Sequence, residues 1–295
     1  MPNIELHPPH EISAFRKIAL GTWRDAYDPS VYGTIEVVAD AALDYIERYR
    51  VATGRRLTIS HLMAKASAAA LARMPDANAI LRFNRPYRRK SIGVFFQVAM
   101  ADDGDDKIDL SGATLYDVDQ KDLATLVDEF EEKVHKVRTR ADPALEKTRN
   151  AFRPIPFLLM NMLLRVITTL SHTFNLDLRW AGIPNDPFGS MMITNIGSLG
   201  LETAYVPLVP YARVPLLLAL GEVTKRAVVE EDAVVVRQVL RIHATFDHRV
   251  LDGYHAAVMS KVIRAHLTEP DKHFGPPPIE PAPRAAQAAA EAALV

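Results

Sequence analysis

The sequence predicts an α/β fold built as one large domain. Its 295 residues are many for one domain and few for two large ones. Hydrophobic residues make up 48% of the chain and charged residues 24%, a balance typical of a soluble globular protein with a sizeable core. Helical patterns and runs of strand-forming residues both occur along the chain, and this mixture indicates an α/β fold.

The charge balance and the amino-acid usage exclude several classes of function. The chain has 35 basic and 36 acidic residues, so its net charge of −1 attracts it neither to nucleic acid nor to an anionic surface as a whole. It has no cysteine, which excludes disulfides, thiolate metal sites and a cysteine nucleophile. The N-terminus lacks the basic start and apolar run of a signal peptide, and we therefore expect a cytoplasmic protein.

The N-terminal half contains two predicted strands and three predicted helices. Strands are expected over residues 32–38 and 92–100. The first helix begins near Asp40 and continues to Tyr49, and an alanine-rich, mostly buried helix runs over residues 62–74 before Pro75. The third, over residues 122–140, has the apolar spacing of an exposed amphipathic helix.

The C-terminal third is predicted to be mostly strands. They cover residues 191–196, 214–221, 227–230 and 234–246 and are separated by Gly, Asp and Pro. A helix is expected over residues 254–267. The predicted domain covers residues 1–275, and the proline- and alanine-rich residues 276–295 are expected to form a flexible tail.

An apolar stretch at residues 157–170 has several interpretations. It lies within an apolar segment of about residues 150–185, and Arg165 interrupts it. A membrane-spanning helix needs about 20 apolar residues with few charges. The alternatives are a buried helix or one at a subunit interface, the lining of a channel for acyl chains, and a contact with a membrane surface.

A histidine at the end of a predicted strand is the strongest indication of chemistry. His248 ends the run Ala-Thr-Phe-Asp-His, and Asp252 and Gly253 follow it at a short distance. Histidine alone has an ordinary pKa in the range needed to take a proton from a thiol or hydroxyl near neutral pH. His248 is therefore the candidate general base.

Residues 247–253 resemble the signature of a known family. Their sequence, Asp-His-Arg-Val-Leu-Asp-Gly, is similar to the Asp-His-Arg-x-x-Asp-Gly motif of the acyltransferase core of 2-oxoacid dehydrogenase complexes, the dihydrolipoamide acyltransferases. The shorter His-x-x-x-Asp-Gly pattern is shared with chloramphenicol acetyltransferase and other CoA-dependent acyltransferases. The resemblance implies a fold of the chloramphenicol acetyltransferase type, with a mixed sheet and helices packed against it.

A second motif supplies the candidate oxyanion donor. Residues 193–200, Ile-Thr-Asn-Ile-Gly-Ser-Leu-Gly, resemble the family's Ile-Ser-Asn-x-Gly-x-x-Gly motif, whose serine hydroxyl stabilises the tetrahedral intermediate. Thr194 occupies the serine position and Asn195 is a supporting residue. The hydroxyl is retained, but the additional methyl group can restrict its rotamer.

Asp252, Gly253 and an N-terminal arginine are expected to support the histidine loop. In the family the aspartate pairs with an arginine, for which Arg16 and Arg24 are candidates, and Arg16 is favoured because its surroundings resemble the family's opening motif. Gly253 is expected to permit a tight turn into the next helix. The resemblance also implies trimers, or multiples of trimers, in which Thr194 and His248 act across a subunit interface.

Three clusters of polar residues have the composition of possible sites for a metal ion, for calcium or for the phosphates of CoA. His248, Asp252 and His255 could form a metal site, but their spacing suits one poorly, and no metal is expected. The acidic turn 102–106 lacks the closing glutamate of an EF-hand calcium loop. The basic run over residues 82–90 could contact the phosphates of CoA or could be a solvated turn.

The expected function is CoA-dependent acyl transfer to a thiol or hydroxyl, with acyl-CoA as substrate and no metal. The sequence contains no lipoyl-lysine motif and no lipoyl or subunit-binding domain. A lipoyl group would therefore be supplied in trans by a lipoyl-domain protein, or another acceptor is used. The alternative is a catalytically weak oligomeric scaffold with the same fold, and transfer of long acyl chains is a third hypothesis.

Overall fold

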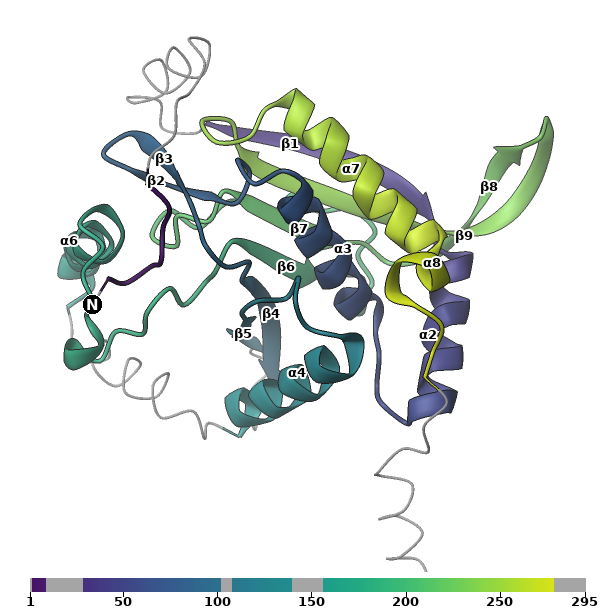
Figure 1. Ribbon diagram of the computed structural model, residues 1–295, viewed down its shortest axis with the longest axis horizontal. Helices are drawn as coiled ribbons and strands as arrows, with labels where there is room; N and C mark the ends of the chain where they lie inside the picture. The colour runs from purple at the N-terminus through teal and green to yellow at the C-terminus, as the bar shows by residue number, and fades with distance from the viewer. Residues whose placement is uncertain (1, 9–28, 102–107, 140–155, 279–295) are drawn as a thin grey trace, which may run out of the picture.

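Seven strands form one mixed sheet in the computed structural model, which describes residues 2–8, 29–101, 108–139 and 156–278 (Figure 1). The sheet order is β1-β9-β7-β6-β4-β5, and β8 pairs with β9. The strands are β1 Ser30–Val38, β4 Val94–Ala101, β5 Ile108–Leu115, β6 Met191–Asn195, β7 Leu216–Leu220, β8 Thr224–Glu230 and β9 Ala233–Asp247. A separate hairpin joins β2 Ala79–Arg82 to β3 Arg85–Arg88.

The centre of the sheet is parallel and its flanks are antiparallel. Strand β6 pairs in parallel with β4 and with β7, whereas β9 runs antiparallel to β1, β7 and β8. All five residues of β7 are buried and apolar, as expected for a strand covered on both faces. The mixed sheet confirms the predicted fold class.

The helices form a layer against one face of this sheet (Figure 1). They are α2 Asp40–Thr53, α3 Ile59–Arg73, α4 Leu123–Arg138, α7 Gly253–Thr268 and α8 Pro270–Phe274. Helix α3 lies at the centre and packs closely on α7, because its small alanine side chains let the two backbones approach. Its buried alanines are Ala64, Ala66, Ala68 and Ala70.

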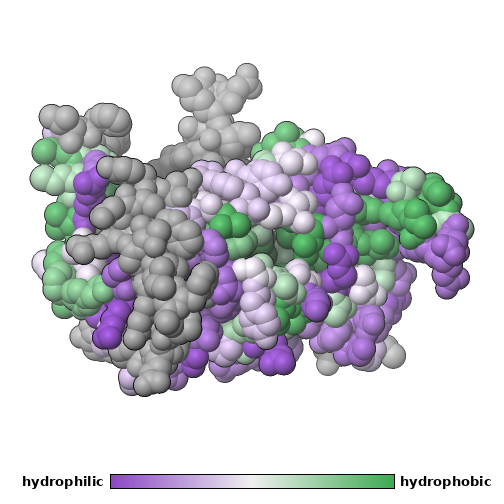
Figure 2. Space-filling view, turned by 90° about the horizontal axis from the view of Figure 1, so that it is seen from above, coloured by the Kyte–Doolittle hydropathy of each residue, from purple (hydrophilic) through white to green (hydrophobic). Residues whose placement is uncertain are grey.

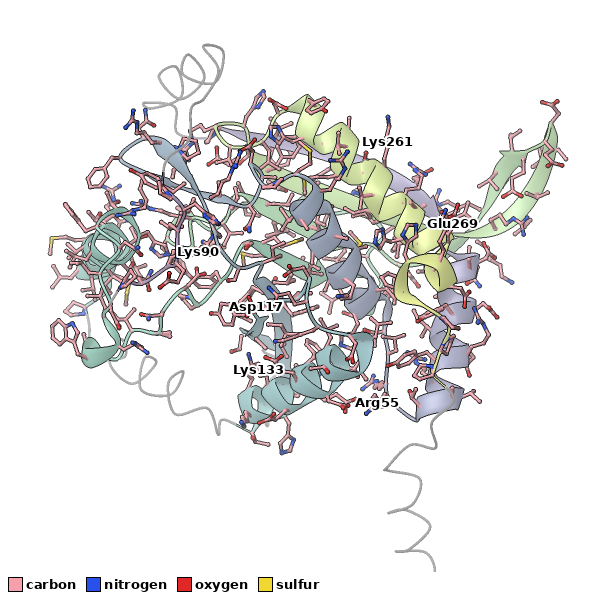
Figure 3. The ribbon with its side chains drawn as sticks, viewed as in Figure 1. Arg55, Lys90, Asp117, Lys133, Lys261 and Glu269 are labelled. Carbon is pink, nitrogen blue, oxygen red and sulfur yellow. The ribbon has the colours of Figure 1, made fainter. Side chains whose placement is uncertain are left out.

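Polar contacts at the edge of the layer hold α4 in place. The Lys133 ammonium donates a hydrogen bond of 2.6 Å to the Thr114 carbonyl on β5 and lies over the ring of Tyr116. Arg55, in the connection between α2 and α3, pairs with Asp128 on α4 (Figure 3). The amphipathic helix predicted over residues 122–140 is confirmed, and Asp122 is its N-cap, accepting a hydrogen bond from the Thr125 backbone N–H.

The predicted helix over residues 62–74 and the strands of the C-terminal third are also confirmed, with ends shifted by a few residues. The sequence patterns do not predict four of the described helices and strands, namely β2, β3, β5 and α8. The basic run over residues 82–90 was treated as a turn, although it contains β3. Strand β5 was not predicted at all. The acidic turn 102–106 and the tail beyond residue 278 lie outside the described residues.

The apolar stretch at residues 157–170 forms helix α6 (Phe157–Thr168), which continues into a π-helical turn, η1 (Thr169–Thr173). Helix α6 lies at one end of the molecule, away from the helical layer (Figure 1). In the described part of the chain, no helix combines the length and apolar character needed to cross a bilayer. One stripe of α6 is exposed in this chain, so the helix is not buried on all sides.

Two histidines are buried as neutral groups. Burial lowers the pKa of His61 to about 4, and the nearby Arg50 and Arg56 contribute. Burial, with Arg89 and Arg213, also lowers the pKa of His172 to about 4. Both side chains are at most 5% exposed, so their protonation opposes folding.

We expect the free energy of unfolding to fall as the pH decreases from about 6.5 to about 4. In this window the unfolded chain binds protons on His61 and His172 that the folded protein does not bind, so stability rises with pH. Each histidine accounts for up to about 3 kcal/mol across the whole window. Urea unfolding at about pH 7.5, 6, 5 and 4.5 measures the free energy of unfolding across this pH range. His61→Gln should flatten the dependence by about half. An unchanged dependence in that variant would contradict the prediction.

Candidate active site

The turn after β9 is held by its own backbone and by an ion pair. The N–H groups of Val250 and Leu251 donate to the Asp247 carbonyl at 3.0 and 2.9 Å. The Asp247 carboxylate accepts from the Arg249 backbone N–H at 2.9 Å and pairs with its guanidinium at 2.7 Å. These contacts give Asp247 and Arg249 a role that their positions in the motif alone did not reveal. They fix the shape of the turn that carries His248.

Two hydrogen bonds orient His248. Its backbone N–H donates to the Pro29 carbonyl at 3.0 Å, and its ring Nδ1 lies 2.8 Å from the Leu251 carbonyl. A carbonyl can only accept, so Nδ1 carries the proton of the neutral ring. The lone pair is then on Nε2, which is the atom that can act as a base. The half-buried ring is thus held in one tautomer by the turn itself.

Asp252 caps helix α7. Its Oδ1 accepts from the backbone N–H groups of Tyr254 and His255 at 3.0 and 3.1 Å and from His255 Nδ1 at 2.7 Å. A carboxylate at this position satisfies N–H groups that have no partner within the helix. The cap joins the His248 turn to the helical layer. The predicted arginine partners, Arg16 and Arg24, lie outside the described residues.

The reason expected for Gly253 is wrong. The backbone at Gly253 is not in the left-handed region, and an added Cβ would meet no described atom within 4 Å. A side chain at this position therefore meets no steric barrier in the turn. Gly253 is simply the first residue of α7.

Thr194 is the second-last residue of β6, and its side chain is half-buried. Asn195 follows it and holds the next turn, accepting from the Ser198 N–H at 3.1 Å. The Asn195 amide also donates to the Ser60 hydroxyl at 3.4 Å, near the start of α3. Asn195 therefore connects the Thr194 strand to the central helix.

The glycines of this motif are required by close packing and by backbone conformation. A Cβ on Gly197 would lie 2.6 Å from the Gly221 carbonyl oxygen, too close for any side chain. Gly200 ends the short helical turn Gly197–Leu199 with a φ of 73°, which favours glycine. The motif thus packs against the chain leaving β7 and fixes where β6 ends.

One chain does not bring Thr194 and His248 together. Thr194 pairs with Ala219 on β7, and Ala219 pairs with His243 on β9. His248 is five residues further along the chain than His243. At about 3.3 Å per residue and 4.8 Å between strands, the two Cα atoms are roughly 15–20 Å apart. The structure therefore places the two candidate residues at separate positions, which we call the two candidate half-sites.

Each half-site borders a different cleft. Thr194 lines a cleft of about 650 Å³ between the sheet, α3 and α4; its polar lining includes Arg56, Asn195, Ser198, His135 and Arg138. A second cleft, of about 470 Å³, is lined by neighbours of His248 but not by His248 itself. These neighbours are Pro29, Asp247, Arg249 and Val250, and Arg213 also lines the cleft. The two clefts share no lining residue.

Sequence reasoning missed two residues of these clefts. Arg213 has a left-handed backbone with φ 52°, and its Nη1 donates to Thr173 Oγ1 at 2.7 Å. His61 lines the Thr194 cleft, and its Nδ1 accepts from the Thr58 N–H at 3.1 Å. No sequence motif includes either residue. The close approach of separate segments creates their role.

The basic run over residues 82–90 is largely committed to ion pairs. Arg88 pairs with Asp76, the buried Arg89 with Asp186, and Lys90 with Glu5. These pairs argue against a phosphate-binding cluster and in favour of a structural role. In the described residues, no three His, Asp or Glu side chains are arranged to hold a metal ion.

Known sequences match the C-terminal part of the chain. Residues 187–274 match the family described as the catalytic domain of 2-oxoacid dehydrogenases acyltransferase. Over 81 residues, 28% of this chain, the sequence is 33% identical to the dihydrolipoyllysine-residue acetyltransferase component of the pyruvate dehydrogenase complex of Bacillus subtilis (strain 168). That match spans only 18% of the Bacillus protein. The family match includes the two motifs around Thr194 and His248.

Two solved structures match most of the chain in fold. They are the cubic core of the pyruvate dehydrogenase multienzyme complex and the dihydrolipoamide acetyltransferase of Azotobacter vinelandii. Each has a TM-score of 0.61 and 20% sequence identity and covers 91% of this chain and 100% of its own. The work on the Azotobacter enzyme concerns the catalytic role of a serine, a histidine and an asparagine.

At this identity the structural match establishes the fold, and the sequence match identifies the segment that carries both motifs. Residues 187–274 are therefore similar in sequence to the catalytic domain of the 2-oxoacid dehydrogenase acyltransferases, and the fold of most of the chain is similar to that of these two solved structures.

Proposed function

We propose that this protein is a CoA-dependent acyltransferase that moves an acyl group between CoA and a thiol or hydroxyl acceptor. The observation that carries the proposal is the hydrogen bond from His248 Nδ1 to the Leu251 carbonyl. It fixes the tautomer in which Nε2 is the base, on a turn whose sequence matches the acyltransferase family. A scaffold would have no need of an imidazole held in this way.

In the proposed reaction, His248 Nε2 takes the proton of the acceptor thiol or hydroxyl as its sulfur or oxygen attacks the thioester carbonyl of acyl-CoA. The Thr194 hydroxyl donates a hydrogen bond to the oxyanion of the tetrahedral intermediate. When the intermediate collapses, the bond to the CoA sulfur breaks. The CoA thiolate then takes the proton from the His248 imidazolium. The cycle needs neither a metal nor a covalent enzyme intermediate.

The active site is proposed to form between subunits. Thr194 and His248 are roughly 15–20 Å apart in one chain, too far for both to contact one thioester. A cyclic oligomer, for which a trimer or a multiple of trimers is our proposal, would place the His248 turn of one subunit beside Thr194 of the next. The match in fold to a multienzyme core supports such an assembly.

The acceptor is left to experiment, and dihydrolipoamide supplied in trans is the first candidate because the matching Bacillus protein is a dihydrolipoyllysine-residue acetyltransferase. Release of free CoA from a panel of acyl-CoAs tests the proposal, with dihydrolipoamide and then simple alcohols and amines as acceptors. His248-dependent release with dihydrolipoamide would identify a lipoyl-dependent enzyme. Release only with another acceptor would identify a free-standing acyltransferase, and no release from any donor would leave the scaffold.

Replacing the proposed base should abolish most of the activity. We expect His248→Ala to lower kcat by about 10²–10⁴-fold, the usual contribution of a general base. The exposed His273, on α8, provides the matched control, since His273→Ala removes an imidazole elsewhere. Steady-state CoA release measures both variants. Equal activity of His248→Ala and the wild type would refute the role of His248.

The role of the Thr194 hydroxyl can be tested separately from that of its methyl group. Thr194→Val keeps the branched side chain but removes the donor, and we expect it to lower kcat by about 10²–10³-fold. Thr194→Ser keeps the donor and frees its rotamer, so its kcat should equal or exceed that of the wild type. Wild-type activity of Thr194→Val would refute the role of the hydroxyl, and similar losses in both variants would show that the methyl group matters as well.

A mixed oligomer tests whether the site is shared. His248→Ala and Thr194→Val chains, each inactive alone, are co-expressed with different tags and purified by both. If neighbours supply the two residues, every trimer that carries both tags has one site with both residues intact, so about one third of the wild-type activity is restored. In a large randomly mixed assembly the restored share is about one quarter. Activity that stays at the level of the single variants would place both residues of a site in one chain.

A further inference from the structure

Helix α6 and the turn η1 expose a continuous apolar stripe. Leu159 is 45% exposed, Met162 61%, Val166 49% and Leu170 36%. Their spacing of three, four and four residues places them on one side of the helix. None of the four lines either of the clefts around the half-sites. The exposed stripe therefore lies apart from these two clefts.

The tip of the β2–β3 hairpin extends this stripe. Phe83, 59% exposed, meets Phe174, 53% exposed, edge to face with ring centres 5.6 Å apart. Phe174 immediately follows η1, and Arg82 on β2 donates from Nε to the Thr173 carbonyl at 3.1 Å. We call the stripe and the two phenylalanines the α6 face. Apolar side chains gather at the end of the molecule where α6 lies (Figure 2).

The cations around the α6 face have no acidic partners. Arg165 is exposed on α6 and Arg85 is exposed at the hairpin, and neither forms an ion pair within the described residues. Arg82 likewise has no carboxylate partner there and lies over the Tyr87 ring. Among the described residues, the acidic side chains that contact residues 78–90 or follow the helix are themselves paired with basic ones: Asp76 with Arg88, Asp177 with Arg179, Asp186 with Arg89 and Glu5 with Lys90.

The local sequence has the same one-sided charge. Residues 156–176 and 78–90 contain no Asp or Glu, although the chain as a whole has 36 acidic residues against 35 basic. An even distribution would place acidic residues in both segments. The net charge of −1 therefore conceals a face that is apolar and positive.

We propose that the α6 face binds the surface of an anionic lipid bilayer, with α6 lying in the plane of the interface. An exposed apolar stripe flanked by arginines is the combination that such surfaces bind. The described helices cannot span a bilayer, so the contact is peripheral. A twofold contact between two copies would instead bring the same positive patches together. Phe83 also lines the cleft beside His248, but none of the residues substituted below lines either cleft.

Flotation of the full-length protein with lipid vesicles tests this proposal. The probes are vesicles of phosphatidylcholine alone and vesicles in which part of it is replaced by phosphatidylglycerol. We expect flotation with the anionic vesicles only, and less of it at high salt. Arg165→Gln and Arg85→Gln should each weaken partitioning about fivefold, the usual effect of one basic residue near an anionic surface.

A double variant tests the apolar stripe. Met162→Glu with Val166→Glu should lower partitioning by more than about tenfold, because two apolar side chains no longer enter the interface. Val51→Glu, at a 79% exposed position on α2, is the matched control and should float like the wild type. Circular dichroism checks that each variant is folded.

Three results would overturn the proposal. They are no flotation of the wild type, equal flotation with neutral vesicles, and full flotation of the folded glutamate variant. Light scattering measures the size of the oligomer and so tests the alternative that the α6 face forms a contact with another protein. A wild type that does not float and a glutamate variant that forms a smaller oligomer would identify a protein contact.

Discussion

Strand β9 connects the sheet to the candidate chemistry. Over its length it hydrogen-bonds to β1, β7 and β8, so its position is fixed from both edges. The antiparallel pairing with β1 continues to Asp247, the residue before His248, and β7 is paired as far as Phe246. The His248 turn therefore begins at the end of a strand that cannot shift in register without disrupting two ladders. A base must keep its lone pair aimed within fractions of an ångström, and this strand supplies the rigidity.

The same register explains why the site is divided. Thr194 and His243 lie on one rung of the sheet, and His248 lies beyond its end. Moving His248 to the rung of Thr194 would require the strand to end five residues earlier, and the pairing of residues 243–247 with β1 would then be lost. The fold thus favours rigid placement of each half-site over proximity within one chain. In the proposed assembly, association of subunits satisfies both requirements, and activity would then depend on assembly.

Much of this was predictable where the sequence carries local signals. The His248 turn and the Thr194 motif are each one continuous stretch of sequence. Helices α3 and α4 have clear N-terminal caps and apolar residues at helical spacing. Strand β5 was missed because it contains Gly112, which usually weakens a strand. The structure shows the reason for Gly112: the Phe95 ring on β4 covers it, and a Cβ would lie 2.0 Å from that ring. Contacts between distant segments, like those of Arg213 and His61, leave no pattern that one sequence can reveal.

The apolar segment was the hardest to interpret, because hydrophobicity alone does not distinguish a buried helix from an interfacial one. Two facts separate them here. Exposure shows which side of α6 is uncovered, and the distribution of charge shows what that side can contact. Arg165 is an obstacle if α6 is buried or crosses a bilayer, since an unpaired charge in an apolar medium is costly. At an anionic surface the same guanidinium stays solvated and adds to the attraction. The residue that argued against a transmembrane helix is thus the one that supports a peripheral contact.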